Sequence, residues 1–264
     1  MTKLSFRIYP LVEVLAADEL SCFGSLVDQV YELLRKRIVD LSLPPEFALV
    51  EQEVASALKV SKTPVREAII RLSREGLVKV VPKSGSYVTE VSLERYLESC
   101  FMRTQLEVGC VKRLAVEGIG SADQVRLRSI LTEQQQAINE NDDDRFFALD
   151  EALHELFFVL AGLPGVWEVM NFAKAEIDRV RHIKRLFGIR QRRLVVQEHA
   201  ALVDAIVARD PDAAELAMIQ NIGAVDDEMV AISDNPHLLR TIEDLNQLVA
   251  LDQRPRGYTK SGTT

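Results

Sequence analysis

Three residues of this 264-residue chain combine the types and the spacing of metal ligands. Asp150 and His154 stand four residues apart in "LDEALHELFFVLAG", so a helix would carry both side chains on one face. His199 lies in a separate helical segment, and one carboxylate with two imidazoles is a common ligand set for a divalent transition metal. An Asp and a His at this spacing also form ordinary polar pairs, so the pattern alone leaves both interpretations open.

A second group of residues has the chemistry of nucleic-acid recognition. Ser61 is a favourable N-cap for a helix whose first turns carry Lys62, Thr63 and Arg66. The free N–H groups and the positive dipole at such a helix end favour phosphate, and side chains there can reach base edges in a major groove. The alternative is an ordinary capped surface helix whose charges are solvated.

A short turn after this helix extends the same surface. "PKSG" separates two apolar stretches, "LVKVV" and "SYVTEV", and indicates the tip of a hairpin. Gly85 permits a tight turn there, while Lys83 and Ser84 are suited to contact phosphate or a minor groove. The residues predicted to contact DNA are therefore Ser61, Lys62, Thr63, Arg66, Arg71, Lys83, Ser84 and Gly85.

The elements that must position these residues follow from hydrophobic periodicity. Apolar residues recur at helical spacing in "SLVDQVYELLRKRIVDLSL" and in "EQEVASALKV", and a third helix begins after Ser61. With the hairpin, these helices predict a winged helix-turn-helix domain over residues 24–91. Residues 1–23 form an extension of unknown role, either packed or frayed.

The second half of the chain is helical almost throughout. Gly, Pro and Asp/Asn breaks predict an antiparallel helical bundle over residues 92–251, followed by a polar tail at 252–264. The predicted fold class is therefore mainly α, a winged helix-turn-helix followed by an all-helical bundle. The expected helices lie near 93–117, 121–140, 143–161, 165–187, 190–208, 211–232 and 236–250.

Composition and charge limit the function classes. The net charge is −8, yet residues 24–90 hold ten basic against nine acidic residues, so the acid excess lies elsewhere and does not exclude a DNA-binding surface. No apolar run reaches the roughly 18 residues of a membrane span. The three cysteines, Cys22, Cys100 and Cys110, form no CxxC pair, which favours a reducing cytoplasm and small buried side chains over a disulfide framework.

These motifs together resemble a known family. The stretch from "LVDQVYELLRKRIV" through "VSKTPVREAIIRLSREGLV" to "GSYVTEVS" is similar to the winged-helix domain of GntR-family transcriptional regulators. The resemblance implies that Lys62, Thr63 and Arg66 contact bases and phosphates, with Gly85 in the wing. Several residues depart from the family pattern: Ser42 and Pro45-Glu46 replace Gly and Pro-Gly, Lys59 replaces the turn Gly, Lys62 replaces Arg, and Gln52 stands where DNA-contacting members often carry Arg.

The helical half resembles the FadR-like branch of that family, whose ligand-sensing domain is called FCD. The resemblance rests on "MRTQLEVGCVKRLA", "LDEALHELFFVLAG" and "VQEHAALVDAIVARDPDAAELAMIQN". It implies one divalent metal, Zn²⁺ or Ni²⁺, held by Asp150, His154, His199 and Asn221, although Asn221 stands where a third His is expected and an amide oxygen is a weaker ligand. Arg103 resembles the arginine that pairs with an effector carboxylate. An i, i+4 ion pair between Arg103 and Glu107 is the alternative.

The sequence thus predicts a cytoplasmic, homodimeric and ligand-responsive repressor of transcription. Its expected partners are double-stranded operator DNA and a small carboxylate, with no membrane and no catalysis. A metal-dependent enzyme built on Asp150, His154 and His199 is one alternative, although the chain shows no general base, nucleophile motif or phosphate loop. A helical interaction module with a degenerate head is another. The basic stretch "DRVRHIKRLFGIRQRRL" is expected to form solvated helix faces with one residue in a pocket, and a second nucleic-acid surface is the alternative.

Overall fold

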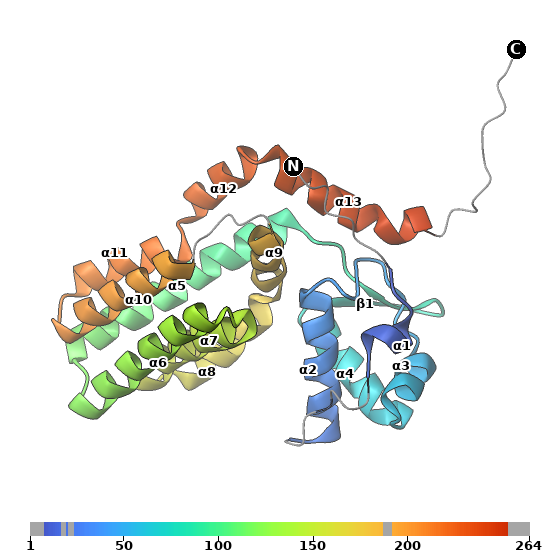
Figure 1. Cartoon of the computed structure of the whole chain (residues 1–264), viewed down its shortest axis with the longest axis horizontal. Helices are drawn as coiled ribbons and strands as arrows, with labels where there is room; N and C mark the ends of the chain where they lie inside the picture. The colour runs from blue at the N-terminus through green and yellow to red at the C-terminus, as the bar shows by residue number, and fades with distance from the viewer. Residues whose placement is uncertain (1–7, 17–19, 21–23, 187–191, 253–264) are drawn as a thin grey trace, which may run out of the picture. The chain divides into compact units, whose positions relative to one another are not determined.

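The computed structural model describes residues 8–16, 20, 24–186 and 192–252, and the chain forms two compact units (Figure 1). One unit comprises the chain up to Val91 together with the part from Pro236 onward, and the other runs from Ser92 to Asn235. The division between the two units lies after Val91. The C-terminal helix differs, because its contacts group it with the winged-helix unit and not with the helical bundle that was expected to reach residue 251.

The first unit is a winged helix-turn-helix. Its helices bury the apolar stripes predicted from their spacing, including Val54, Ala55 and Leu58 in the second helix of the motif. The two strands pair antiparallel, from Val78 opposite Val88 to Val81 opposite Gly85. The elements are α1 (Leu11–Val14), α2 (Leu26–Val39), α3 (Glu51–Leu58), α4 (Lys62–Arg74), β1 (Val78–Val81), β2 (Gly85–Val88) and α13 (Pro236–Asp252).

Both ends of this unit are held by specific contacts. In the N-terminal extension Leu11, Val14 and Leu15 are buried, so this part of the extension is packed. On α13 the Asn246 amide accepts a hydrogen bond from Val91 N–H at 2.8 Å and donates one to Val91 C=O at 3.0 Å. This amide satisfies both backbone groups of Val91, as a neighbouring strand would, and ties α13 to the end of the winged helix.

Two of the three residues that the resemblance places at glycine positions have the backbone conformation that glycine favours. Glu46 has φ 65° and Lys59, the C-cap of α3, has φ 56°, both in the left-handed region. In the loop after α2 the left-handed residue is Leu41, with φ 65°, and not the neighbouring Ser42 that the resemblance indicated. The turns of the family are therefore kept here with side chains that strain them.

The second unit is all helical among its described residues, as predicted. Two of the expected helices are each divided. The helix expected at 165–187 breaks at Lys174, and the one expected at 211–232 breaks at Gly223, whose φ of 85° leaves the helical region. The helices are α5 (Leu93–Glu117), α6 (Ser121–Glu140), α7 (Asp143–Leu160), α8 (Pro164–Ala173), α9 (Ala175–Leu186), α10 (Arg192–Val207), α11 (Pro211–Ile222) and α12 (Val225–Ser233).

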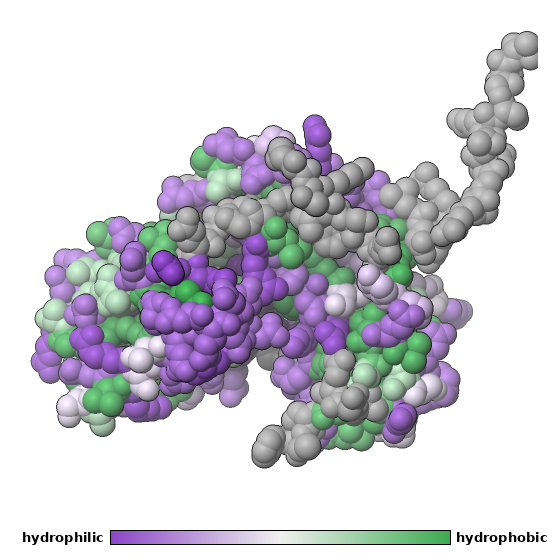
Figure 2. Space-filling view, in the orientation of Figure 1, coloured by the Kyte–Doolittle hydropathy of each residue, from purple (hydrophilic) through white to green (hydrophobic). Residues whose placement is uncertain are grey.

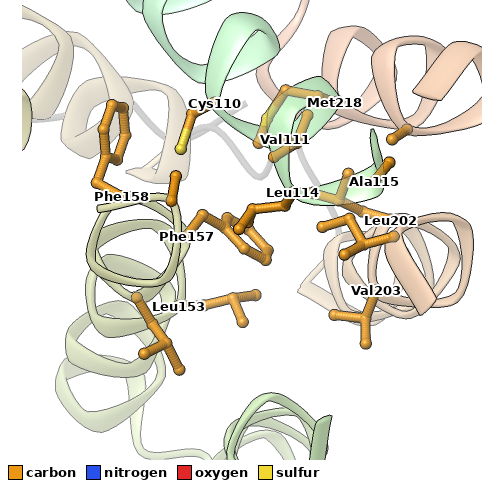
Figure 3. Packing of buried hydrophobic residues seen from close by; sticks show 14 of the residues in the cluster. Cys110, Val111, Leu114, Ala115, Leu153, Phe157, Phe158, Leu202, Val203 and Met218 are labelled. Atoms are coloured by element: carbon orange, nitrogen blue, oxygen red, sulfur yellow. The ribbon is translucent and has the colours of Figure 1, made fainter. Parts of the chain in front are cut away.

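The core of this unit lies between α5, α7, α10 and α11 (Figure 3). Leu114 from α5, Phe157 from α7 and Leu202 from α10 point toward one another there. Cys100 and Cys110 are free and buried, as expected for small apolar side chains, while Cys22 lies outside the described residues. This packing fixes the helices whose polar residues form the site described below.

The visible surface is mostly hydrophilic, with hydrophobic residues scattered among polar ones (Figure 2). Within the described part of the chain, no helix combines the length and the apolar character that a bilayer crossing requires.

Candidate functional site

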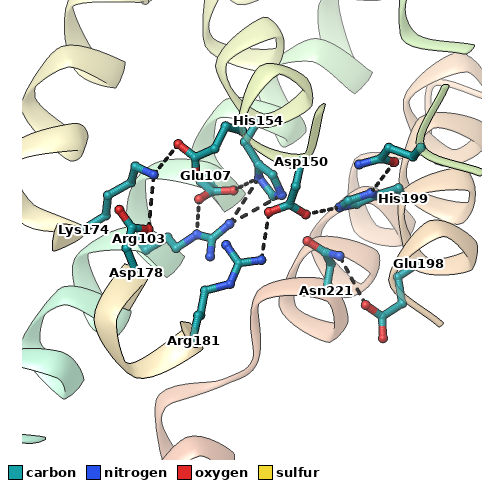
Figure 4. Close-up of polar contacts among 12 residues, drawn as sticks. Arg103, Glu107, Asp150, His154, Lys174, Asp178, Arg181, Glu198, His199 and Asn221 are labelled. Atoms are coloured by element: carbon teal, nitrogen blue, oxygen red, sulfur yellow. Dashed lines mark hydrogen bonds and ion pairs between the residues drawn. The ribbon is translucent and has the colours of Figure 1, made fainter. Parts of the chain in front are cut away.

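The three predicted metal ligands meet inside the helical unit (Figure 4). Asp150 and His154 project from one face of α7, and His199 reaches them from α10. One ligand atom from each lies within 4.8 Å of the others, and all three side chains are buried. His199 Nε2 faces Asp150 Oδ1 at 3.4 Å. The i, i+4 pair and the separate histidine therefore form one cluster.

A second layer of polar residues orients the two imidazoles. His199 Nδ1 lies 3.0 Å from Oε1 of Gln134, an acceptor on α6, so Nδ1 donates to this oxygen and Nε2 is the ring nitrogen that faces Asp150. His154 Nδ1 makes a short contact with the carboxylate of Glu107 on α5. Partners of this kind fix the tautomer and the ring orientation of metal-binding histidines.

The carboxylates of the cluster are ionised at neutral pH. Burial by itself raises the pKa of Glu107, but the charges of Arg103 and His154 outweigh burial and hold this pKa at about 2. Burial likewise opposes ionisation of Asp150, and Arg181, whose Nη2 lies 2.8 Å from Asp150 Oδ2, holds the pKa of Asp150 well below its usual range. Carboxylate ligands must be deprotonated to hold a metal, and this environment supplies that condition for Asp150.

The donor set fits a divalent cation. Asp150 Oδ1 is fully buried and accepts no hydrogen bond from the described residues, which is costly for a carboxylate oxygen unless a cation faces it. Asn221 on α11 lies beside the cluster, and its Nδ2 donates to Glu198 Oε2 at 3.2 Å (Figure 4). That bond orients the amide of Asn221, the residue at the position expected for the fourth ligand.

A basic cavity of about 540 Å³ adjoins this cluster. Arg103 and Arg181 belong to both, because they line the cavity while their guanidinium groups contact Glu107 and Asp150. Aromatic side chains, among them Tyr96, give the cavity an apolar part. Its charged lining residues are Arg103, Arg181, Lys184, Arg185, Arg192 and Arg193 against Asp143 and Glu228.

This cavity corrects the interpretation of the basic stretch at 179–193. The stretch was expected to form solvated helix faces with one residue in a pocket, but five of its basic residues line the cavity and Arg179 is fully buried against Glu176. Arg190 lies outside the described residues. Arg103, predicted to bind an effector, lines the cavity and also makes the i, i+4 ion pair with Glu107 that was the alternative, so its role toward an effector stays a prediction.

The predicted DNA-reading end of α4 is exposed. Ser61 is the N-cap of α4, but its hydroxyl makes no capping hydrogen bond to the helix backbone. Lys62 and Thr63 are exposed beside it. Arg66 is exposed as well, and its guanidinium bonds the Glu51 carboxylate of α3 at 2.9 and 2.8 Å.

Arg71 takes a different position from the other predicted DNA contacts. Five residues beyond Arg66, it lies well around the helix from Lys62 and Arg66. Its Nη1 bonds Asp28 Oδ1 at 2.6 Å, and its guanidinium stacks over the Tyr31 ring at 4.1 Å. Both partners belong to α2, so Arg71 connects α4 to α2 inside the domain.

The tip of the wing consists of Pro82, Lys83 and Ser84, between β1 and β2. Lys83 is exposed with φ 64°, and Gly85 has φ 140° at the start of β2. Ser84 Oγ lies 2.9 Å from the Tyr87 hydroxyl, which steadies the turn. Lys83 and Ser84 are thus presented at the end of a short rigid hairpin.

Two residues of these sites were missed by sequence reasoning. Gln134 lies in a polar segment, "TEQQQAINE", and only its complete burial distinguishes it from its neighbours. Glu51 lies in the first turn of α3, where an acidic residue is ordinary, so no local signal marks its bond with Arg66. The contacts of Gln134 with His199 and of Glu51 with Arg66 both join residues of different helices, so they depend on tertiary packing.

Comparison with known families identifies both halves of the chain. Residues 26–88 match the family described as "Bacterial regulatory proteins, gntR family", and residues 98–224 match the FCD domain. The chain is 32% identical over 201 residues to the HTH-type transcriptional repressor RspR of Escherichia coli strain K12, covering 76% of this chain and 87% of that protein. It is 35% identical over 216 residues to an HTH-type transcriptional regulator of Streptomyces ambofaciens, covering 80% and 89% of the two chains.

Solved structures agree with this fold. The E. coli protein McbR/YncC superposes with a TM-score of 0.66 at 23% identity, covering 83% of this chain and 99% of that one. A GntR-type regulator from Rhodococcus sp. RHA1 superposes with a TM-score of 0.61 at 22% identity, covering 79% and 99% of the two chains. At these identities, the likeness shows the fold alone.

Proposed function

The chain belongs to the GntR family of transcriptional regulators with an FCD domain, and we propose that it is a homodimeric repressor whose helical unit senses a small carboxylate. It is a regulator and not an enzyme, since the families and relatives that it matches are regulators of transcription. The carboxylate sensing is carried by one observation: a buried Asp-His-His cluster adjoins a basic cavity.

The winged helix is proposed to read DNA through the exposed end of α4 and the tip of the wing. Lys62, Thr63 and Arg66 would enter the major groove, with Ser61 at the phosphates, and Lys83 and Ser84 would contact the flanking backbone. Gly85 stays among the proposed DNA-binding residues, because a glycine at the start of β2 lets the wing backbone approach the DNA closely. Arg71 is assigned to the half-exposed contact between α4 and α2, where Asp28 and Tyr31 hold it.

The helical unit is proposed to bind one divalent cation, Zn²⁺ or Ni²⁺, at Asp150, His154 and His199. Asn221 is the fourth candidate ligand, through its amide oxygen. A cation here would supply a positively charged binding point for an effector oxygen next to Arg103 and Arg181. The basic lining of the cavity favours a carboxylate over a neutral or cationic ligand, because guanidinium groups pair with carboxylates through two parallel hydrogen bonds.

Repression and dimerisation are proposed from the relatives and from the mode of DNA reading. The E. coli relative carries the name of a transcriptional repressor. Two winged helices related by a two-fold axis would read a palindromic operator, in the cytoplasm where chromosomal DNA is found. The effector would change operator affinity by binding one arrangement of the dimer better than the other.

Metal analysis and calorimetry test the sensing part of this proposal. Full-length protein incubated with Zn²⁺ or Ni²⁺ and then desalted is expected to retain about one cation per chain, and Asp150→Ala is expected to retain none. A panel of small mono-, di- and tricarboxylates is then titrated into the metal-loaded protein. A well-folded chain that retains no cation and binds no carboxylate of the panel would contradict the sensing proposal.

A further inference from the structure

Arg66 is held by an acidic partner in a defined geometry. Its Nε lies 2.9 Å from Glu51 Oε1 and its Nη2 lies 2.8 Å from Glu51 Oε2, so the carboxylate binds one edge of the guanidinium with two parallel hydrogen bonds. The hydrogen bond from Arg66 lowers the pKa of Glu51, which keeps the carboxylate ionised at neutral pH. The side chain of Arg66 is still 63% exposed, and ion pairs as exposed as this one contribute little to stability. A role in positioning Arg66 explains the pair better than a role in stability.

The bond with Glu51 leaves the other edge of the Arg66 guanidinium open. A guanidinium has five N–H groups, and Glu51 takes the one on Nε and one on Nη2. The remaining groups on Nη1 and Nη2 point together, in the fork that pairs with O6 and N7 of guanine. Glu51 therefore fixes the rotation of the guanidinium and aims its free edge away from α3.

The charge of the Arg66–Glu51 pair decides whether Arg66 is suited to a DNA phosphate or to a base. A phosphate approaching Arg66 would also meet the carboxylate of Glu51, and two anions side by side repel each other. The acceptors of guanine are neutral, so they gain the fork of Arg66 without that repulsion. The paired Arg66 is thus suited to a base and poorly suited to the DNA backbone.

On this basis we propose that Glu51 is a specificity-determining positioning residue, which aims Arg66 at one guanine in each half of the operator. The inference rests on the proposed DNA-binding function and adds to it the base that Arg66 reads and the residue that aims it. Lys62 forms no salt bridge among the described residues, although its charge also lowers the pKa of Glu51, and it remains suited to the phosphates.

The test begins with duplexes that the full-length protein selects from a random pool. Binding is then measured for each base substitution in the selected site, with wild type, Arg66→Ala, Glu51→Gln and the control Glu53→Gln. Glu53 is exposed on the same turn of α3 but about 200° around the helix, so its variant removes the same charge from α3 without removing the bond to Arg66. We expect Arg66→Ala and Glu51→Gln to weaken the preference for guanine at the same position by about tenfold or more. Glu53→Gln should keep that preference.

Salt dependence separates a base contact from a phosphate contact. The double variant Glu51→Gln/Arg66→Ala should leave the slope of log affinity against log salt unchanged, because it removes a neutral pair that displaces no counterion. Three results would overturn the inference while leaving the proposed function intact. These are full guanine preference in Glu51→Gln, equal loss of preference in Glu53→Gln, or a slope that falls by about 0.9 per half-site in the double variant without a change in base preference. Failure of the wild type to select any duplex would instead overturn the proposed DNA-binding function, and this inference with it.

Discussion

His199 illustrates how one buried amide decides what an imidazole can bind. The acceptor oxygen of Gln134 lies 3.0 Å from His199 Nδ1, which leaves Nε2 directed at Asp150. If the amide were absent, the ring would be free to rotate or to carry its proton on Nε2, and the ligand atom would be lost for part of the time. The chemistry of the cluster therefore depends on a residue that binds no metal itself.

The first prediction concerns this amide. Gln134→Ala should weaken Zn²⁺ binding by about 10- to 100-fold, which is the usual cost of losing such a partner. The affinity is measured by competition with a chromophoric chelator. Gln135→Ala, one residue along and exposed on the same helix, is the matched control and should bind as wild type does. Equal affinity of Gln134→Ala and wild type would show that Gln134 does not orient His199.

A pH-dependent prediction follows from Asp28, which joins α2 to α4. Its carboxylate accepts hydrogen bonds from Ser25 and from Arg71, and these lower its pKa from 3.8 to about 2. Because the folded-state pKa is depressed, the stabilisation is complete above the unfolded value and is lost as pH falls through the folded value.

Asp28→Asn should therefore lower the melting temperature at pH 7 and lower it progressively less as pH falls from 3.8 toward about 2. Thermal unfolding of both proteins, measured at a series of pH values, follows the difference. A difference in melting temperature that stays constant down to pH 2 would mean that the Asp28 charge does not stabilise the fold.

At the scale of elements, the turn between α3 and α4 carries strain that the family usually avoids. Lys59 ends α3 in the left-handed region, where a side chain costs about 1 kcal/mol relative to glycine. Leu58 on α3 and Val65 on α4 are both buried, so packing fixes the two helices. The turn that joins them therefore keeps Lys59 in the left-handed conformation.

Lys59→Gly should accordingly stabilise the helix-turn-helix by about 1 kcal/mol. Native-state hydrogen exchange of amides in α3 and α4 reports this free energy locally, without requiring the whole chain to unfold in one step. Lys59→Ala loses the same charge but keeps the Cβ atom, so it should give no such gain. If the alanine variant protected these amides as well as the glycine variant, the gain would come from charge and not from backbone strain.

The elements themselves were predictable from the sequence far better than their polar partnerships. Periodicity located α5, α6 and α7 almost to the residue, because their apolar stripes and their breaks are local features. The break at Lys174 carries no glycine or proline, and it was missed. The burial of Arg179 and the cavity position of Arg181 were also missed, because a basic helix face looks solvated until another helix covers it.

At the scale of the whole molecule, a ligand-responsive repressor requires that its affinity for the carboxylate and its affinity for DNA be coupled. A carboxylate that binds the metal-loaded protein should change its affinity for the selected duplex by about 5- to 150-fold, and the duplex should change carboxylate affinity by the same factor. Both affinities are measured on one preparation, by fluorescence anisotropy and by calorimetry. Asp150→Ala should bind the duplex but lose this response. If every carboxylate that binds the protein left its affinity for the duplex unchanged, ligand and DNA binding would not be coupled and the proposed response would be contradicted.

The central claim is that this regulator reads DNA through the exposed end of α4, and one binding measurement tests it most directly. The double variant Lys62→Ala/Arg66→Ala removes two charges from that end, and Arg126→Ala/Arg128→Ala removes two exposed arginines from α6 as the control. On the duplex selected by the wild type, the α4 variant should lose at least about thirtyfold in affinity, while the control should stay within about twofold. An α4 variant that binds this duplex as tightly as the wild type would contradict the account.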